Sequence, residues 1–190
     1  MDIAPELAAS LGFPTPAYTA VERERRWLCR AVPRDLELRT ERITDLYVTG
    51  ARLRLREARP LSGAAPILRL SRKADVDART RLVTSIYLQE AEFEMLAGSL
   101  QGRRVHKLRH RLPREEGVVL LVDEFLGDLA GLVLAEAEFK SAERMAAYVA
   151  PAFALREITD DPRFTGATLE LVRLTHWMAF GARLVVAWMW

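Results

Sequence analysis

The 190-residue chain has one cysteine, three histidines and a formal net charge of only +2. The single cysteine, Cys29, excludes a disulfide within the chain and fits a reducing compartment. The small net charge gives no general sign of binding to nucleic acid or to a membrane. No basic stretch followed by an apolar run marks a signal peptide near the N-terminus. Together these absences favour a cytoplasmic protein.

Long apolar runs are also missing from the chain. Residues 177–190 form the most apolar late stretch, but Gly181 and Arg183 interrupt it, and it is too short to span a bilayer. Half of the residues are hydrophobic, which is enough for one domain with a sizeable core. We expect a lead-in at 1–18, a main domain at 19–169 and an apolar extension at 170–190. This extension is expected to dock on the main domain or on another subunit, which leaves a homodimer open.

Charges are segregated along short alternating stretches, and residues 21–28 (VERERRWL) are the clearest case. Alternation with a period of two predicts a strand with Glu22, Glu24 and Arg26 on one face. Such a face suits no dry core, because burying an unpaired ion costs several kcal/mol. It must therefore meet water, a metal ion, an anion or opposite charges.

Three further stretches alternate in the same way. Residues 51–56 and 106–112 have purely basic faces, and residues 133–139 have a purely acidic face. The charged side chains are Arg52, Arg54 and Arg56, then Lys107, Arg109 and Arg111, and finally Glu136 and Glu138. A solvated outer face would explain any one of these strands, but such a face normally mixes signs and includes Ser, Thr and Gln. A closed sheet with a charged interior, its apolar outside covered by helices, explains all of them at once.

Turn signals and periodicity divide the chain into short elements. Strands are expected at 21–28, 43–47, 52–57, 67–73, 80–88, 103–112, 118–125 and 132–139. Helices are expected at 6–11, at 90–100, from an N-cap at Ser141 to about 149, and at 169–183. The polar segment 35–43 is expected to form a helical turn or two, and residues 151–168 are expected to be irregular. Arg56, Arg69 and Arg111 either point inward or lie at the mouth of the closed sheet.

The ordered set of charged motifs resembles the CYTH superfamily, also called the triphosphate tunnel metalloenzymes. VERERRWL is similar to the E-x-E-x-K signature of that family, with Arg26 in place of the lysine. Further matching segments are RLR at 52–54, KLR at 107–109, DEFLGDLAGLVLAEAEF at 123–139 and REITDDPRF at 156–164. The resemblance spans about residues 20–169.

The resemblance implies an α+β fold, in which an eight-stranded antiparallel β-barrel, the tunnel, is flanked by helices. Members hydrolyse inorganic or thiamine triphosphate, remove RNA 5′ phosphates or cyclise ATP, and single-domain bacterial forms most often look like inorganic triphosphatases. The implied cofactor is Mg²⁺ or Mn²⁺, with the metal ligands Glu22, Glu24, Glu136 and Glu138. The implied catalytic residues are Glu22, Glu24, Arg26 and Asp123. The implied substrate-binding residues are Arg52, Arg54, Lys73, Lys107 and Arg109.

The residue types suit this chemistry in their own right. Guanidinium groups offer paired donors to phosphate oxygens, and lysine offers a point charge. Glutamates are hard oxygen ligands for Mg²⁺, which typically binds through a few carboxylates together with substrate phosphates.

The sequence departs from the family pattern where further glutamates are expected. Val83 and Ser85 stand at the expected positions on the strand at 80–88, and Leu121 stands two residues before Asp123. Substrate binding is therefore better supported than catalysis. The alternatives are a metal-dependent triphosphatase for inorganic or small organic triphosphates, and a non-catalytic binder of triphosphate, polyphosphate or nucleotide. An adenylate cyclase ranks lower because no pattern marks a purine pocket. No nucleic-acid partner is expected, because the basic residues lie within strands with little aromatic interleaving.

Overall fold

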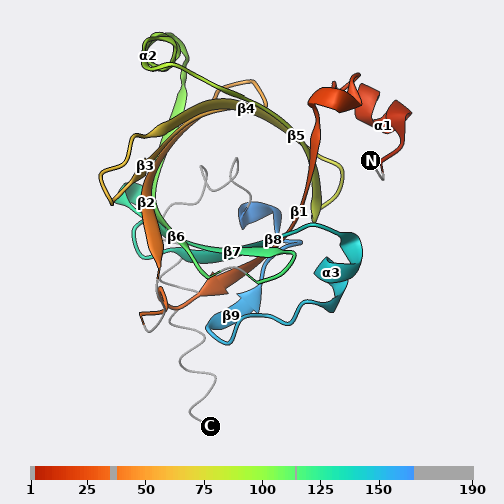
Figure 1. Ribbon diagram of the computed structural model, residues 1–190, viewed down its shortest axis with the longest axis vertical. Coiled ribbons are helices and arrows are strands. Elements are labelled where there is room, and N and C mark those ends of the chain that lie inside the picture. The colour runs from red at the N-terminus through yellow and green to blue at the C-terminus, as the bar shows by residue number, and fades with distance from the viewer. Residues whose placement is uncertain (1–2, 35–37, 114, 165–190) are drawn as a thin grey trace.

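The structure, a computed structural model, describes residues 3–34, 38–113 and 115–164. Its centre is an antiparallel sheet with the strand order β5-β4-β3-β2-β6-β7-β8-β1-β9. Strand β5 also pairs with β1, and this pairing closes the eight strands from β1 through β8 into a barrel (Figure 1). The eight-stranded antiparallel barrel expected from the resemblance is therefore confirmed.

Among the described residues, the barrel strands follow one another along the chain with one α-helix, between β5 and β6, and one short 3₁₀ helix, between β7 and β8. They are β1 (Ala20–Cys29), β2 (Arg39–Val48), β3 (Leu53–Pro60), β4 (Ile67–Asp75), β5 (Thr80–Tyr87), β6 (Gly102–Arg111), β7 (Val118–Phe125) and β8 (Val133–Phe139). A further strand, β9 (Ala154–Glu157), pairs with the end of β1. The helices are α1 (Pro5–Ser10), α2 (Glu90–Ser99) and α3 (Ala142–Ala147), with short 3₁₀ helices η1 (Pro16–Tyr18), η2 (Gly127–Leu129) and η3 (Pro162–Phe164).

Strand alternation separates the two faces of the barrel wall. Trp27 and Cys29 on β1 are buried in an apolar cluster with Phe139 on β8, whereas Glu24 and Arg26 line the interior. The rings of Trp27 and Phe139 both pack against Tyr148, which follows α3. Burying side chains of this size stabilises the fold by roughly 1.5–3 kcal/mol each. This apolar cluster therefore lies outside the barrel, whereas the charges lie inside it together with a second apolar cluster, whose members Val105, Phe125, Leu134 and Phe164 also line the cavity.

The flanking helices cover only parts of this apolar outside. Helix α1 supplies Ala8 to a small cluster with Phe13, Ala74 and Leu82. Helix α3 begins at Ser141, whose Oγ accepts a hydrogen bond from the backbone N–H of Arg144, as the N-cap prediction required. Helix α2 buries none of its residues. Among the described residues, no helix is long and apolar enough to cross a membrane.

Two predicted stretches differ from the structure. Residues 39–43 are not a helical turn but the first part of β2, because β2 pairs with β6 over its whole length, from Arg39 opposite Arg111 to Val48 opposite Gly102. Residues 154–157 are not irregular, since they form β9 on the edge of β1. The helix expected at 169–183 lies outside the described residues.

Candidate active site in the barrel

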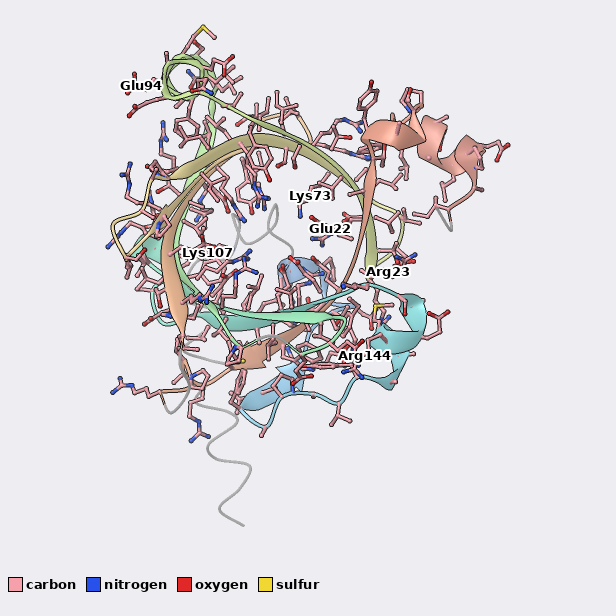
Figure 2. The ribbon with its side chains drawn as sticks, in the orientation of Figure 1. Glu22, Arg23, Lys73, Glu94, Lys107 and Arg144 are labelled. Atoms are coloured by element: carbon pink, nitrogen blue, oxygen red, sulfur yellow. The ribbon has the colours of Figure 1, made fainter. Side chains whose placement is uncertain are left out.

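The barrel interior holds one cavity of about 210 Å³ with a strongly charged lining. Its basic residues are Arg26, Arg54, Arg56, Arg69, Lys73, Arg81, Lys107, Arg109 and Arg111. Its acidic residues are Glu22, Glu24, Glu41, Asp123, Glu136 and Glu138. Figure 2 shows Glu22 and Lys73 pointing toward each other inside the ring of strands, with Lys107 on the opposite wall. Nine cations against six carboxylates favour an anionic ligand.

The structure brings together almost all of the residues singled out from the sequence. Arg56, Arg69 and Arg111, whose direction was left open, all line the cavity. Arg52 differs, because it precedes β3, is exposed and does not line the cavity. The alternating sequence pattern begins before the strand does, so Arg52 lies in the turn that follows Gly50 and not on β3.

The basic side of the cavity is held by a buried carboxylate, Asp45, which was not among the predicted site residues. Asp45 on β2 is fully buried, and both of its oxygens accept hydrogen bonds of 2.6 Å from Arg56. Arg54 Nε lies 3.6 Å from the same carboxylate. Burial alone would raise the pKa of Asp45, but Arg56 and Arg54 hold it well below its usual range. Asp45 therefore stays ionised and fixes two arginines.

A second buried cluster joins β6 to β7. Asp123 accepts hydrogen bonds from Lys107 Nζ at 2.6 Å and from Arg109 Nε at 2.7 Å and Nη2 at 2.8 Å. Burial would raise the pKa of Asp123, but Arg109 and Lys107 outweigh it and hold the pKa far below its usual range. Burial lowers the pKa of Lys107 to about 8, with help from Arg109, although Asp123 opposes the shift. Asp123 thus orients two cations toward the cavity.

The opposite side of the cavity is a carboxylate wall, formed by Glu22 and Glu24 on β1 and by Glu136 and Glu138 on β8. Glu24 stands opposite Glu138 in the register of the two strands. Burial, followed by repulsion from Glu136, raises the pKa of Glu24 to about 7. Burial, Glu136 and Glu22 likewise raise the pKa of Glu138. Mutual repulsion of this kind disappears when a cation lies between the carboxylates.

Lys73 and Arg81 make the shortest charge contacts with the carboxylate wall. Lys73 on β4 forms an ion pair with Glu22. Arg81 on β5 places Nη1 2.7 Å from Glu24 Oε1, in a charge contact that lacks hydrogen-bond geometry. Arg81 was not among the predicted site residues, although alternation puts it on the same face of β5 as Val83 and Ser85.

Arg26, predicted to be catalytic, is committed largely to the protein backbone. Its Nη1 donates to the carbonyl of Phe164 at 2.7 Å and its Nη2 donates to the carbonyl of Thr159 at 3.2 Å. Arg26 Nε lies 3.5 Å from Glu24 Oε1, and neither atom has a hydrogen-bond partner among the described residues. Arg26 therefore ties the segment after β9 to the barrel interior.

The carboxylate wall has the right donors for a divalent metal but is not a complete site by itself. Among residues 3–34, 38–113 and 115–164, no group of three or more His, Cys, Asp or Glu side chains is placed to hold a metal ion. Mg²⁺ commonly binds through one or two carboxylates plus substrate phosphates, so a preformed cage is not required. The residues therefore fit a metal whose remaining ligands come from a polyphosphate.

Comparison with known proteins gives a consistent set of relatives. No family model matches the chain. An inorganic triphosphatase of Nitrosomonas europaea is 30% identical over 154 residues, which cover 79% of this chain and 97% of that protein. An inorganic triphosphatase of Acetivibrio thermocellus is 40% identical over 65 residues, 34% of this chain and 40% of that protein.

Solved structures agree with the sequence comparison. A crystal structure of an inorganic triphosphatase superposes with a TM-score of 0.54 and 29% identity, and the match covers 80% of this chain and 95% of that chain. A protein of Pyrococcus horikoshii superposes with a TM-score of 0.51 and 22% identity over 66% of this chain and 82% of that one. At that lower identity, the second likeness shows a shared fold.

Proposed function

This chain belongs to the family of the inorganic triphosphatases, the CYTH or triphosphate tunnel proteins, and we propose that it hydrolyses inorganic triphosphate inside its barrel. The observation that carries the proposal is the barrel cavity, whose lining combines nine basic side chains with a wall of glutamates. A linear polyphosphate needs many donors for its oxygens, and the carboxylates suit the metal ion that accompanies it.

The size of the cavity favours an inorganic substrate. Sites for drug-sized organic ligands usually measure roughly 300–1,000 Å³. A cavity of about 210 Å³ lies below that range, and its lining is dominated by charge. A lining of this kind suits phosphate oxygens better than a purine ring, so adenylate cyclase activity still ranks lowest.

Five cations are proposed to bind the phosphates. The predicted residues Arg54, Lys73, Lys107 and Arg109 line the cavity, and Arg56 lines it as well. Asp45 and Asp123 hold these cations in place, so a positioning role is proposed for Asp123 instead of a direct catalytic one. Arg26 is assigned a positioning role because it holds Phe164 and Thr159. Binding by Arg52 stays a prediction, at the edge of the site.

The carboxylate wall is proposed to hold the divalent metal. Glu22, Glu24, Glu136 and Glu138 would bind Mg²⁺ or Mn²⁺, which neutralises charge on the phosphates and activates water when bound. Glu22 is the most accessible of the glutamates on β1, with 29% of its side chain exposed, while Glu24 is 1% exposed. Metal and substrate are therefore expected to reach the wall past Glu22.

One observation favours the non-catalytic alternative. Strand β5 contributes Arg81 but no carboxylate to the cavity lining, and Val83 and Ser85, which share the strand face of Arg81, do not line the cavity. Lys73 and Arg81 also neutralise Glu22 and Glu24. A tunnel altered in this way binds triphosphate well and turns it over slowly.

The test is phosphate release from inorganic triphosphate, thiamine triphosphate and ATP, measured with Mg²⁺, with Mn²⁺ and with EDTA. We expect metal-dependent release that is fastest with inorganic triphosphate and is abolished in Lys107→Met. Tight binding of triphosphate without any release would establish the non-catalytic alternative. Formation of a cyclic nucleotide from ATP would overturn the assignment.

A further inference from the structure

Arg81 places a guanidinium group at the carboxylate wall of the barrel. Its Nη1 lies 2.7 Å from Glu24 Oε1, and its Nε donates to Asp75 Oδ1 at 2.6 Å. The Arg81 side chain lines the cavity and is 12% exposed, and Glu24 is 1% exposed. The group is therefore held between two carboxylates while it still faces the cavity.

Two strand pairings fix the position of Arg81. In the register of β5, Arg81 stands opposite Glu22 on β1 and opposite Asp75 on β4. These pairings lie at the seam where β5 closes the barrel against β1. Because both neighbouring strands hold the residue, the guanidinium is preorganised and loses little freedom on meeting a ligand.

Glu24 requires a positive partner in this setting. A buried carboxylate without an opposite charge is strongly destabilising, and a divalent metal ion or a guanidinium group can supply that charge. Arginine remains protonated at any ordinary pH and presents donors in a planar fork that matches phosphate oxygens. Arg81 therefore offers a permanent positive charge where a metal would otherwise be needed.

We propose that Arg81 is a polyphosphate-binding residue that supplies, beside Glu24, a fixed positive charge in place of one metal ion. This inference rests on the proposed function and specifies how the ligand is held. Its consequence is that inorganic triphosphate binds the tunnel in the absence of any divalent metal. A metal ion then adds to an anion site that already exists.

Arg79 provides a matched control on the same stretch of chain. It lies two residues before Arg81, and its Nη1 and Nη2 donate to Asp160 at 2.7 and 2.8 Å. Its side chain is 41% exposed and does not line the cavity. Arg79→Met removes the same charge from the chain as Arg81→Met, but outside the site.

The experiment is calorimetric titration with sodium tripolyphosphate, first in EDTA and then in Mg²⁺. We expect the wild type to bind in EDTA, Arg81→Met to bind at least about tenfold more weakly there, and Arg79→Met to match the wild type. Added Mg²⁺ should recover much of the loss in Arg81→Met. Arg81→Lys, which keeps the charge but loses the fork, should fall between the wild type and Arg81→Met, and it serves if Arg81→Met fails to fold.

The outcomes separate this inference from the proposed function. A wild type that binds tripolyphosphate only with Mg²⁺ overturns the inference and leaves the triphosphatase proposal standing. Equal binding by the wild type, Arg81→Lys and Arg81→Met in EDTA also overturns it. A wild type that binds no tripolyphosphate under either condition overturns both.

Discussion

Asp45 and Arg56 form a two-pronged salt bridge beneath the basic side of the cavity. Arg56 Nε and Nη2 donate to the two carboxylate oxygens at 2.6 Å each, and the residues stand opposite each other in the β2–β3 register. Asp45 is fully buried, and 4% of the Arg56 side chain is exposed. The geometry aligns two parallel charge-assisted hydrogen bonds, which is the strongest arrangement for this pair of groups. Asp45 thus holds the Arg56 guanidinium group in position at the cavity.

Asp45→Asn should lower the free energy of unfolding by about 3–5 kcal/mol, because it leaves Arg56 buried without a countercharge. The asparagine keeps the shape of the side chain, so lost packing adds little. Urea unfolding followed by circular dichroism measures the change. Glu57→Gln is the control, because Glu57 pairs with the exposed Arg59 and its loss should cost less than about 1 kcal/mol. Equal effects of the two substitutions would refute the conclusion that the ion pair of Asp45 with Arg56 stabilises the fold.

Acid should unfold the protein through its buried aspartates. In the folded state the pKa values of Asp45 and Asp123 are held well below their usual range, because their arginine and lysine partners outweigh burial. In the unfolded chain both groups titrate near about pH 3.9. Their contribution to stability is therefore complete above that pH and is lost as the pH falls toward the folded pKa values.

The corresponding measurement is the free energy of unfolding between about pH 6 and about pH 2. We expect a steep decline below about pH 4 in the wild type and a shallower one in Asp45→Asn, which lacks one of the two groups. Parallel curves for the two proteins would show that Asp45 is not ionised in the fold.

The barrel could be predicted because its signal is local. Strands such as β1 alternate charged and apolar residues, so Glu24 and Trp27 already indicate which face is which. Asp45 was missed because its neighbours on the same strand face, Ile43 and Tyr47, read as an ordinary core pattern. Only the pairing of β2 with β3 places Asp45 opposite Arg56.

The remaining misses also depend on contacts between distant segments. Arg52 continues the alternation of Arg54, but the sequence does not show that the strand begins at Leu53. Strand β9 exists because β1 offers an edge, which its own four residues do not reveal. Arg81 was not predicted because its own strand does not reveal the pairing of β5 with β1, which places it against Glu24.

Arg54 and Arg52 should differ in their effect on triphosphate binding. Arg54 lines the cavity beside Asp45, and Arg52 is exposed outside it. Arg54→Met should weaken tripolyphosphate binding by at least about tenfold, the usual scale for a lost hydrogen bond to a charged group. Arg52→Met should change it by less than about threefold, as for an exposed charge. The shift of the melting temperature on adding tripolyphosphate reports both values. A larger loss of tripolyphosphate binding in Arg52→Met would show that Arg52 contributes to the binding site.

The cavity face of β5 offers a test of what limits turnover. Val83 stands opposite Lys73 on β4, and Ser85 stands opposite Ser71, with their hydroxyl oxygens 2.7 Å apart. Both positions share the inner face with Arg81, so glutamates introduced there would extend the carboxylate wall. Lys73 lies where it can neutralise a glutamate at position 83, which limits the cost of burying that charge.

We therefore expect slow triphosphatase activity in the wild type and faster turnover in the double variant Val83→Glu with Ser85→Glu. The extra carboxylates would bind a second metal ion, and two metal ions stabilise both the attacking and the leaving oxygen. An increase in kcat of about tenfold corresponds to about 1.4 kcal/mol of additional transition-state stabilisation. The increase should be larger with Mn²⁺ than with Mg²⁺, which demands a more regular geometry. Ile86→Glu is the matched control, because it adds a carboxylate to the opposite, exposed face of the same strand. Fast wild-type turnover that the double substitution leaves unchanged would show that carboxylates on β5 are dispensable, and that the charges on β1 and β8 suffice for the reaction.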